Sequence, residues 1–240
     1  MGKPKEFDVI IVGAGLSGSI LALGLAQLNL EIAIIEAKNL AILHNLDTTN
    51  TRSIAISYKS RHILEQIGIW QSIENMAVPI TAIQVSEKGA FNKVNLNAIQ
   101  ENIPAFGYNI NLLEFNQIVL QKLSDLKNVT VLDNCELNDL QQDTKGVRIE
   151  TVSNNNPVNF QANLLIAADG ANSKVRQLLD IECDIHDYHQ AAVTCNLEIN
   201  QSHNHKAFER FLTNGLIAML PLSGNKVLSV WTTTQEHAAQ

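Results

Sequence analysis

Two short apolar runs open the chain, and a helical stretch lies between them. The runs, FDVIIV at 7–12 and EIAIIEA at 31–37, are rich in β-branched residues and do not alternate with polar ones. That pattern is typical of strands covered on both faces. The intervening residues, from about 16 to 29, read as a helix. Together they predict a βαβ unit of about thirty residues, the length of a right-handed crossover between neighbouring parallel strands.

Two further helices are predicted at 60–74 and 113–126, where apolar residues repeat at helical spacing. The predicted apolar face of the first consists of Ile63, Leu64, Ile67 and Trp70. Between the two helices, residues 81–96 alternate apolar and polar side chains around a glycine-bearing turn. That alternation predicts a hairpin leaving the main sheet.

The middle and the end of the chain are predicted to form strands. Residues 129–168 predict a β-meander with the successive segments NVTVL, CELNDLQ, GVRIETV and FQANLLIAA. Three more strands are predicted at AAVTCNLEI, GLIAMLPL and KVLSVWTTT, between residues 191 and 234. The βαβ unit and the later strands together predict an α/β fold.

The composition fits a folded domain and excludes several classes of function. The 240 residues are 45% hydrophobic, enough to bury a sizeable core in one large domain or two interleaved ones. With 17 basic and 24 acidic residues, a net charge of -7 and no basic cluster, the chain is not expected to bind nucleic acid. No run of eighteen apolar residues occurs, so any membrane contact is expected to be peripheral.

Cysteines and histidines give no sign of a disulfide framework or a metal centre. Cys135, Cys183 and Cys195 are odd in number, widely spaced and without a CxxC motif, which fits a reducing cytoplasm. The HxxH pair at 186–189 and the HxH pair at 203–205 have spacings compatible with metal ligands, but the residues between them are polar. We expect loop histidines there.

The strongest chemical signal is the glycine loop GAGLSG, which follows the first predicted strand directly. Gly13 permits the tight turn, Gly15 lets backbone amides approach a pyrophosphate, and Gly18 lets the helix pack closely on the strand. The helix N-terminus then presents the positive end of its dipole to the phosphates. Glu36, at the end of the second strand, can accept hydrogen bonds from the ribose hydroxyls of an adenosine. These features predict a dinucleotide site, and NAD and FAD share the fingerprint.

A second signal lies at residues 164–176, LLIAADGANSKVR. There an apolar strand ends in Asp169 and Gly170, and a helix is predicted to begin around Ser173. Such a strand end can place backbone and carboxylate beside the middle of an extended cofactor. The alternative is an ordinary connection from strand to helix.

With this Asp-Gly motif the chain resembles the FAD-dependent aromatic hydroxylases, the flavoprotein monooxygenases of the para-hydroxybenzoate hydroxylase type. The resemblance implies that FAD is the cofactor, with its ADP half on the three glycines of the loop and Glu36, and with Asp169 beside its middle. Further motifs are similar to the ubiquinone-biosynthesis hydroxylases, most of all the octaprenyl-methoxyphenol hydroxylases. These motifs are TRSIAIS, LEQIGIW, YHQAAVTCNLE, AFERF, GLIAMLPLS and LSVWTT.

Two more cofactor contacts are implied by this resemblance. Arg52 would reach the FAD pyrophosphate, and Gln117 would contact the cofactor from the far side. A guanidinium near a diphosphate is a bidentate donor, which gives Arg52 a physical case of its own. The alternative is that both are solvated surface side chains.

The resemblance also implies a domain organisation, a Rossmann-like FAD-binding domain with a β-meander, interleaved with a β-sheet substrate domain. The FAD-binding domain would comprise residues 1–75 and 105–185, and the substrate domain residues 76–104 and 186–240. In the substrate domain, the hairpin near 80–96 and the strands after Tyr188 would form the sheet that faces the substrate.

The chain departs from the family pattern in three ways. Asn50 stands where an acidic residue is expected, and Leu216 stands where a proline usually follows the glycine. Members of the family continue through a Gly-Asp segment and closing helices beyond the position of Gln240. The chain is therefore expected to be a fragment or a shortened product, with doubtful catalytic competence by itself.

The activity that the resemblance implies is that of an FAD-dependent monooxygenase. NAD(P)H would reduce FAD, dioxygen would form a flavin hydroperoxide, and a hydroxyl would pass to the ring of a polyprenylated phenol in ubiquinone biosynthesis. The protein would hold the ring near the flavin and exclude water. So apolar a substrate implies a hydrophobic pocket and a cytoplasmic protein that associates peripherally with the inner membrane surface or a biosynthetic complex. No catalytic side chain and no metal ligand is assigned.

Two other interpretations stay open. The chain could belong to an FAD-dependent hydroxylase or dehydrogenase that acts on a soluble aromatic substrate, in which case a prenyl tail would bring no gain in activity. It could also be a non-catalytic module with an FAD-binding fold that binds a partner protein or a lipid. Copurified flavin separates the enzyme interpretations from the last one.

Overall fold

The computed structural model describes residues 4–45 and 52–239. The chain divides into two compact units, and each is described by itself. Unit 1 comprises Met1–Leu46 and Leu113–Asp184, and unit 2 comprises Asp47–Leu112 and Ile185–Gln240. Unit 2 thus takes a longer first segment than the 76–104 expected from the sequence. Which unit serves cofactor and which serves substrate stays a prediction.

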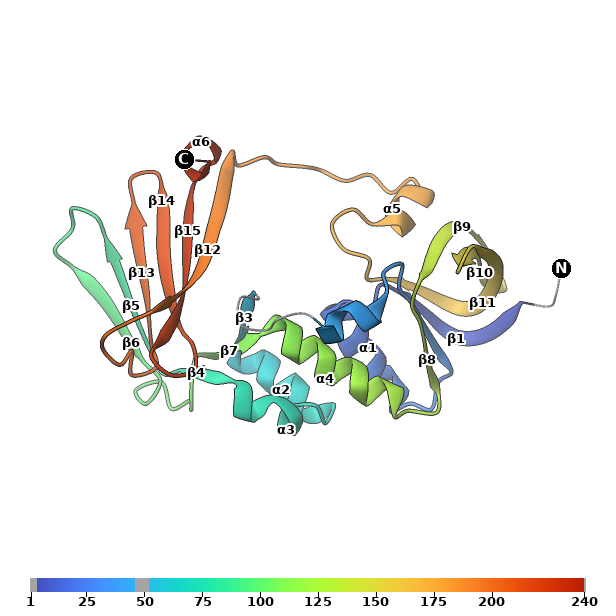
Figure 1. Cartoon of the computed structure of the whole chain (residues 1–240), viewed down its shortest axis with the longest axis horizontal. Helices are drawn as coiled ribbons and strands as arrows, with labels where there is room; N and C mark the ends of the chain where they lie inside the picture. Colours follow the sequence, from blue (N-terminus) through green and yellow to red (C-terminus); the bar gives the residue numbers. More distant parts are fainter. Residues whose placement is uncertain (1–3, 46–51, 240) are drawn as a thin grey trace. The chain divides into compact units, whose positions relative to one another are not determined.

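Unit 1 is built on a six-stranded mixed sheet with the strand order β8-β2-β1-β11-β10-β9 (Figure 1). Its strands are β1 (Lys5–Val12), β2 (Ile32–Ile35), β8 (Val129–Leu132), β9 (Cys135–Asp143), β10 (Gly146–Ser153) and β11 (Asn156–Ala167). Its helices are α1 (Leu16–Ala26), η1 (Leu40–Asn45), α4 (Leu112–Ser124) and α5 (Lys174–Leu178). The predicted βαβ unit is present as β1, α1 and β2, with β1 and β2 parallel.

The prediction that NVTVL is a strand of the meander is wrong, because this segment forms β8, which lies outside the meander. It runs parallel to β2, with Val129 opposite Ile32, and forms the edge of the parallel part of the sheet. The meander itself is β9, β10 and β11. β11 belongs to both parts, since it is antiparallel to β10 from Asn156 to Ala162 and parallel to β1 from Phe160 to Ala167.

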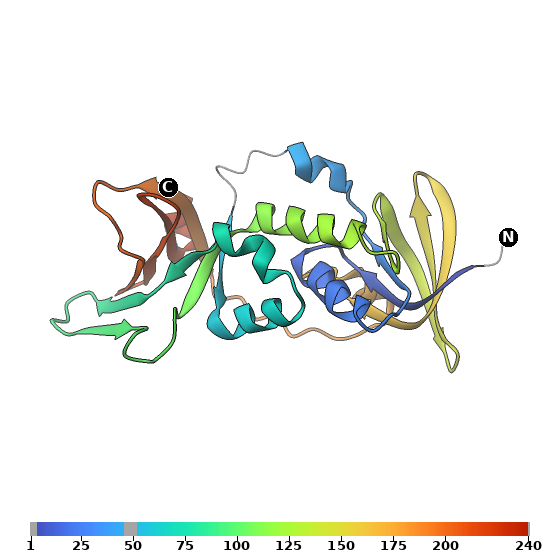
Figure 2. The same ribbon diagram turned by 90° about the horizontal axis from the view of Figure 1, so that it is seen from below.

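The core of unit 1 lies between its strands and helices. Ile10, Ile32 and Ile34 are fully buried, as the absence of polar alternation in their strands predicted. A continuous apolar cluster extends from β1 and β2 to the meander and reaches Val175 in α5. Figure 2 shows α1 (blue) beside the first two strands, on which it packs.

Unit 2 contains a second six-stranded sheet, ordered β12-β15-β14-β13-β5-β6, and a small sheet ordered β3-β7-β4. The large sheet consists of β5 (Ala82–Glu87), β6 (Lys93–Asn97), β12 (Gln190–Glu198), β13 (Lys206–Leu212), β14 (Gly215–Pro221) and β15 (Lys226–Thr234). The small sheet consists of β3 (Ser53–Ser57), β4 (Val78–Ile80) and β7 (Gly107–Asn111), which the hydrophobic pattern did not predict. The hairpin expected near 81–96 is present as β5 and β6.

The prediction of a single helix over residues 60–74 is wrong. The segment forms α2 (Tyr58–Gln66), α3 (Trp70–Ile73) and η3 (Glu74–Met76); a last short helix, α6 (Gln235–Ala238), lies elsewhere in unit 2. Gly68 adopts φ +78°, a left-handed conformation that ends the first helix. Leu64 and Trp70 are buried as expected, but Ile63 is half exposed.

Candidate functional site

The glycine loop between β1 and α1 is packed against the end of β11. Gly13 has φ +105°, and a Cβ built there would lie 2.4 Å from the carbonyl oxygen of Ala168. A Cβ on Gly18 would lie 2.1 Å from the carbonyl oxygen of Gly13. Both positions therefore exclude any side chain, which is the close packing of helix on strand that the sequence predicted.

Gly15 differs from these two glycines, because its absent Cβ faces open space. No atom lies within 4 Å of the position that a Cβ would take. Gly15 is the N-cap of α1, and as a glycine it has no side chain to make a capping hydrogen bond. The amides of Leu16 and Ser17 in the first turn of α1 have no preceding helical turn to bond. The loop thus leaves room for an anion at the positive end of the helix.

Glu36 holds the loop from the neighbouring strand. One carboxylate oxygen accepts a hydrogen bond of 2.9 Å from the backbone amide of Ala14, and the other accepts one of 2.9 Å from the amide of Lys38. The carbonyl of Glu36 accepts a further bond of 2.9 Å from the amide of Cys135. The side chain therefore fixes the glycine loop and the turn after β2 at the same time.

Asp169 holds the opposite side of the loop region, just after β11. Its Oδ2 accepts hydrogen bonds from the amides of Lys174, at 2.7 Å, and Val175, at 3.2 Å, and so caps α5. Its Oδ1 is buried and has no protein partner. An unpartnered buried carboxylate oxygen is costly, which favours a hydrogen-bond donor from a bound molecule at this position.

Four of the predicted site residues line one cavity of about 440 Å³, at the carboxyl ends of β1, β2 and β11. They are Gly13, Gly15, Glu36 and Asp169. Gly18 is buried in α1 and is not part of this lining. The carboxyl ends of parallel strands are where open α/β sheets bind ligands.

Other residues in the same cavity were not predicted from the sequence. They are Lys38, Cys135, Glu136, Asn172 and Lys174, together with apolar and backbone groups from the same strand ends. Burial raises the pKa of the Cys135 thiol, and a hydrogen bond with Thr151 lowers it in part. Cys135 is brought to the site by the hydrogen bond from its backbone amide to the carbonyl of Glu36. No local sequence pattern predicts this pairing.

The residues present fit a dinucleotide. The loop has an open side at Gly15, the residue that begins α1, and Glu36 and the unpartnered Asp169 Oδ1 supply acceptors. Lys38 and Lys174 add two positive charges to the lining, beside the carboxylates of Glu36, Glu136 and Asp169. A diphosphate needs such amides and cations, and sugar hydroxyls need such acceptors.

Two predicted contacts are not among the residues that line this cavity. Gln117 is in α4 of unit 1, half-buried, and is not among the residues that line the cavity. Arg52 is exposed and belongs to unit 2, where its carbonyl accepts a hydrogen bond from Leu112. Both assignments stay predictions. Asn50, the departure from the family pattern, lies outside the described residues.

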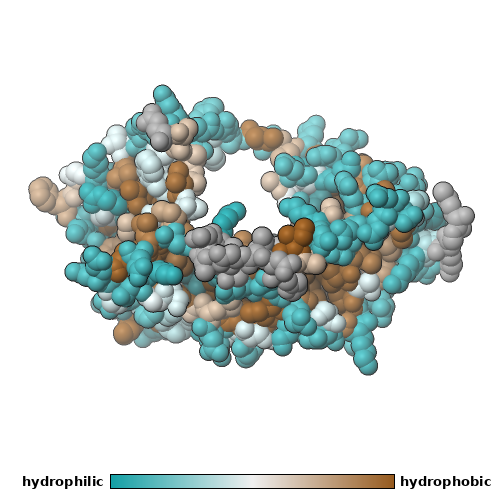
Figure 3. Space-filling view, in the orientation of Figure 1, coloured by the Kyte–Doolittle hydropathy of each residue, from teal (hydrophilic) through white to brown (hydrophobic). Residues whose placement is uncertain are grey.

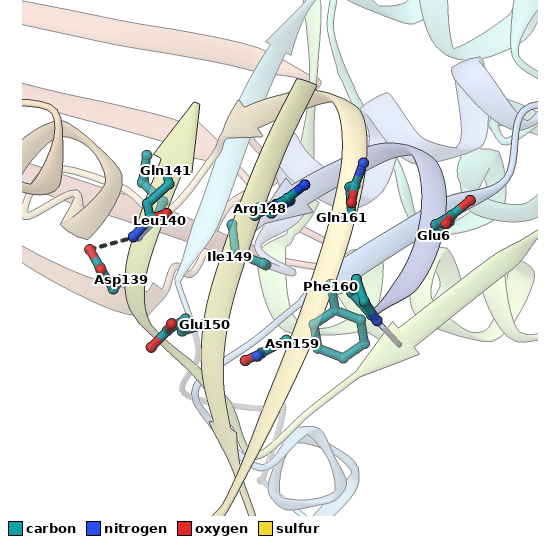
Figure 4. A pocket seen from close by; sticks show the side chains of 11 residues that line it. Glu6, Asp139, Leu140, Gln141, Arg148, Ile149, Glu150, Asn159, Phe160 and Gln161 are labelled. Atoms are coloured by element: carbon teal, nitrogen blue, oxygen red, sulfur yellow. Dashed lines mark hydrogen bonds between the residues drawn. The ribbon is translucent and has the colours of Figure 1, made fainter. Parts of the chain in front are cut away.

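A larger cavity of about 500 Å³ lies on the meander (Figure 4). A cross-strand row of Glu6, Gln161, Arg148 and Gln141 runs along its lining. Its lining includes three carboxylates and a single cation, Arg148. This cavity has no glycine loop and no helix N-terminus in its lining to hold a diphosphate, so the cavity at the glycine loop is the better dinucleotide site.

The histidine pairs do not gather metal ligands in the described part of the chain. Among residues 4–45 and 52–239 no group of three or more His, Cys, Asp or Glu side chains is placed to hold a metal ion. His203 uses both ring nitrogens within the protein, since Nδ1 accepts from the His205 amide and Nε2 contacts the Leu222 and Gly224 carbonyls.

Across residues 4–45 and 52–239, no helix is both long and apolar enough to cross a bilayer.

Comparison with known proteins gives a family. Residues 6–239 match the FAD binding domain family. The ubiquinone hydroxylase UbiL of Rhodospirillum rubrum is 31% identical over 228 residues, which cover 95% of this chain and 52% of that protein. The 3-demethoxyubiquinol 3-hydroxylase of Escherichia coli is 28% identical, with 93% of this chain and 56% of that protein covered. The chain thus spans about half the length of these relatives.

Solved structures show the same fold at low sequence identity. PqsL, a probable FAD-dependent monooxygenase from Pseudomonas aeruginosa, has a TM-score of 0.79 at 17% identity, covering 98% of this chain and 62% of that chain. The p-nitrophenol 4-monooxygenase PnpA of Pseudomonas putida also has a TM-score of 0.79 at 17% identity, covering 97% and 59%. The α/β fold with a Rossmann-like part, a meander and a further sheet, expected from the sequence, is confirmed.

Proposed function

The chain belongs to the FAD binding domain family, and on that premise we propose that it forms the FAD-binding and substrate-facing part of a monooxygenase. The reaction proposed is hydroxylation of a polyprenylated phenol in ubiquinone biosynthesis, with NAD(P)H and dioxygen as co-substrates. The observation that carries the proposal is the cavity where Gly13, Gly15, Glu36 and Asp169 meet. Two relatives of this chain are named as hydroxylases of ubiquinone or its precursors, which supports the substrate class.

In this proposal the chain's own groups bind and orient the cofactor. The first-turn amides of α1 and the open side of Gly15 hold the diphosphate. Glu36 accepts from the adenosine ribose, and the free oxygen of Asp169 accepts a hydrogen bond nearer the middle of the cofactor. When bound, FAD supplies the redox chemistry, taking electrons from NAD(P)H and activating dioxygen.

The substrate side of the proposal is supported by the large sheet of unit 2. By register, Val193, Trp231 and Ile217 form one cross-strand row on β12, β15 and β14. Val193 is 38% and Trp231 37% exposed, unusually open for such side chains. Figure 3 shows brown, apolar residues among the teal ones over this sheet. Such a face suits an aromatic ring with an apolar tail, and apolar walls would exclude water from the reaction.

Flavin binding is the first test of the proposal. Titration of the purified chain with FAD, followed by quenching of flavin fluorescence, should give saturable binding that ADP competes away, because the cavity is proposed to hold the ADP half. Gly15→Val should abolish binding, since a branched side chain would enter the open side of the loop. Gly15→Ser is a milder variant at the same position. Binding that ADP does not affect would contradict the assignment.

The substrate class is tested on the longer protein that contains this chain. Substrate-dependent oxidation of NAD(P)H and formation of hydroxylated product should be faster with a prenylated phenol than with the same phenol without its tail. Equal rates would favour the alternative, a hydroxylase of soluble aromatic compounds. We further propose a cytoplasmic protein that associates with the inner membrane surface, where such a substrate resides.

A further inference from the structure

The charged side chains of the large sheet of unit 2 are divided between its two faces. Adjacent residues of a strand point to opposite faces, and residues directly opposite each other on neighbouring strands share a face. The registers therefore assign each side chain of the sheet to a face, and we refer to one of the two as the cationic face. One of its cross-strand rows is Lys93, Ser86, Arg210, Ile217, Trp231 and Val193. The next row on it is Asn95, Gln84, Phe208, Met219, Ser229 and Cys195.

The carboxylates on these strands, all of which lie in the described part of the chain, point away from the cationic face. Glu87 and Glu209 are each adjacent in sequence to a residue of the first row, and Glu198 lies opposite Lys226 on the same face as them. The other cations of the strands point to the cationic face, and they are Lys93, Lys206 and Arg210. An ordinary solvated surface mixes both signs of charge, whereas here a chain with a net charge of -7 gathers cations alone on one face.

The contacts of the cationic face leave its charges uncompensated. Arg210 Nη1 donates to Ser86 Oγ at 3.5 Å, and Lys206 Nζ donates to Gln84 Oε1 at 2.9 Å. Both acceptors are neutral. Across residues 4–45 and 52–239, neither of these cations nor Lys93 forms a salt bridge.

Edge protection explains only one of the three cations. Lys93 is on β6, the last strand of the sheet, where a lysine discourages pairing with another edge. Arg210 and Lys206 are on β13, which lies between β14 and β5 inside the sheet. Their charge therefore has no such purpose and is available to a ligand.

Apolar and aromatic side chains follow Arg210 along its row. Ile217 and Trp231 lie on the next two strands, and Phe208 is beside Arg210 in the second row. Trp231 and Phe208 are 37% and 38% exposed. Neighbouring strands are about 4.8 Å apart, so the backbones at Arg210 and Trp231 are separated by about 10 Å, close to the length of an aromatic acid with its substituents. The face thus presents a cation at one end and an aromatic surface at the other.

We propose that the cationic face binds a prenylated aromatic acid, a phenol whose ring carries an ionised carboxylate. Arg210 pairs with the carboxylate as a bidentate donor, and Lys206 adds charge beside it. The ring and the start of the tail pack on Ile217 and Trp231. A phenol has a pKa of about 10 and is neutral near pH 7, whereas a carboxylic acid with a pKa of about 4 is charged there. Uncompensated cations therefore select the acid over the corresponding phenol.

This inference deepens the proposed function and rests on it, because it takes the large sheet of unit 2 as the surface that receives the substrate. The registers and charges that carry it are independent of flavin binding. It adds a carboxylate to the proposed substrate class and names Arg210 as the residue that determines specificity for it.

Three matched probes test the preference for an acid. They are 3-geranyl-4-hydroxybenzoate, its methyl ester, and 2-geranylphenol, which lacks the carboxyl group. Quenching of tryptophan emission measures their binding to the purified chain, because Trp231 is exposed while Trp70, the other tryptophan, is buried. At pH 7.5 the acid should bind at least about tenfold more tightly than the ester or the phenol, and added salt should reduce this advantage.

Variants of the two sheet faces locate the binding. Arg210→Gln should lower the affinity for the acid by about tenfold and change that for the phenol by less than about twofold. Arg210→Lys keeps the charge but not the bidentate geometry, so its loss should be smaller, about threefold. Glu209→Gln, at the neighbouring position on the opposite face, is the matched control and should change neither affinity by more than about twofold. Melting curves show that each variant is folded, and the comparison of the three probes on the parent chain needs no variant.

Three results would overturn the inference. The first is equal binding of the acid, the ester and the phenol. The second is a loss of acid affinity as large in Glu209→Gln as in Arg210→Gln. The third is binding of dodecanoate as tight as that of the aromatic acid, which would make the face a site for anionic lipids. FAD titration of the same samples separates the two proposals. Competition between FAD and ADP with no preference for the acid would remove this inference alone, and acid binding without flavin binding would remove the proposed function.

Discussion

The two sheets of the chain use similar apolar strands in opposite ways. In unit 1 all four residues of β2, Ile32–Ile35, are buried, because neighbouring strands and helices cover both faces. In unit 2 the equally apolar β14, Gly215–Pro221, has only Pro221 buried. A closed core can hold backbone amides at fixed positions, whereas an open apolar sheet offers surface to other molecules. The comparison therefore indicates that unit 1 holds backbone groups at fixed positions and that unit 2 offers apolar surface for contacts.

The largest effect is expected at the glycine loop, where unit 1 is most tightly packed. Gly13→Ala and Gly18→Ala should each destabilise unit 1 by about 3 kcal/mol or more, because the added methyl would meet a backbone carbonyl in each case. Denaturant unfolding followed by circular dichroism measures the loss.

Gly15→Ala is the matched control in the same loop. Its methyl group enters open space, so the free energy of unfolding should change by less than about 0.5 kcal/mol. If all three substitutions cost the same, the close contact between the loop and the end of β11 is not present in solution.

A pair of isoleucines makes the comparison of the two sheets direct. Ile34→Ala in β2 removes a side chain that is 0% exposed and should cost about 3 kcal/mol. Ile217→Ala in β14 removes a partly exposed side chain and should cost about 1 kcal/mol. Thermal unfolding of both variants beside the parent chain gives the two losses. Equal losses would mean that β14 is covered as fully as β2.

The sequence predicted the loop region well because its signals are local. A glycine that needs positive φ, such as Gly13, and one that meets a helix, such as Gly18, sit within a few residues of the elements that constrain them. Glu36 and Asp169 were found in the same way, as polar residues at the ends of apolar strands. The structure brings these side chains together, and their contacts with a cofactor stay predictions.

The misassigned strand could not be placed from the sequence, because its partner is distant in the chain. NVTVL reads as one more strand of a meander, yet its partner is β2, with Val129 opposite Ile32. Apolar content does not reveal which edge a strand joins. The break of the helix at Gly68 is a weaker failure, because a glycine within a helical pattern is only a moderate stop signal.

Binding at the site can be separated from the stability of unit 1 through Glu36. Glu36→Ala should weaken FAD and ADP binding by about tenfold, because the loop loses the acceptor that holds the Ala14 amide and the ribose loses its partner. Glu36→Gln keeps an acceptor and should show a smaller loss. Glu31→Ala, at the other end of β2, is the control. Flavin-fluorescence titration measures the FAD affinity of the three variants. An unchanged affinity in Glu36→Ala would mean that the adenosine binds elsewhere.

The test with the smallest expected effect changes no residue. It uses the reactivity of the three free cysteines to compare how well the protein shields them from solvent. Cys183 and Cys195 are exposed, whereas Cys135 in unit 1 is buried. Burial raises the pKa of the Cys135 thiol, so at a given pH less of it is the reactive thiolate, and the protein around it blocks the reagent as well. In a reaction with a disulfide reagent at pH 7.5, two thiols per chain should react quickly and the third at least about tenfold more slowly.

The direction of the Cys135 pKa shift also predicts how stability depends on pH. A thiol with a raised pKa in the folded state favours folding most where it is protonated in both states, so unit 1 should lose stability as pH rises above the ordinary thiol range of about 8.5. Three equally fast thiols would show that the cavity at the glycine loop is open to solvent down to Cys135, and that unit 1 is no better covered there than the sheet of unit 2.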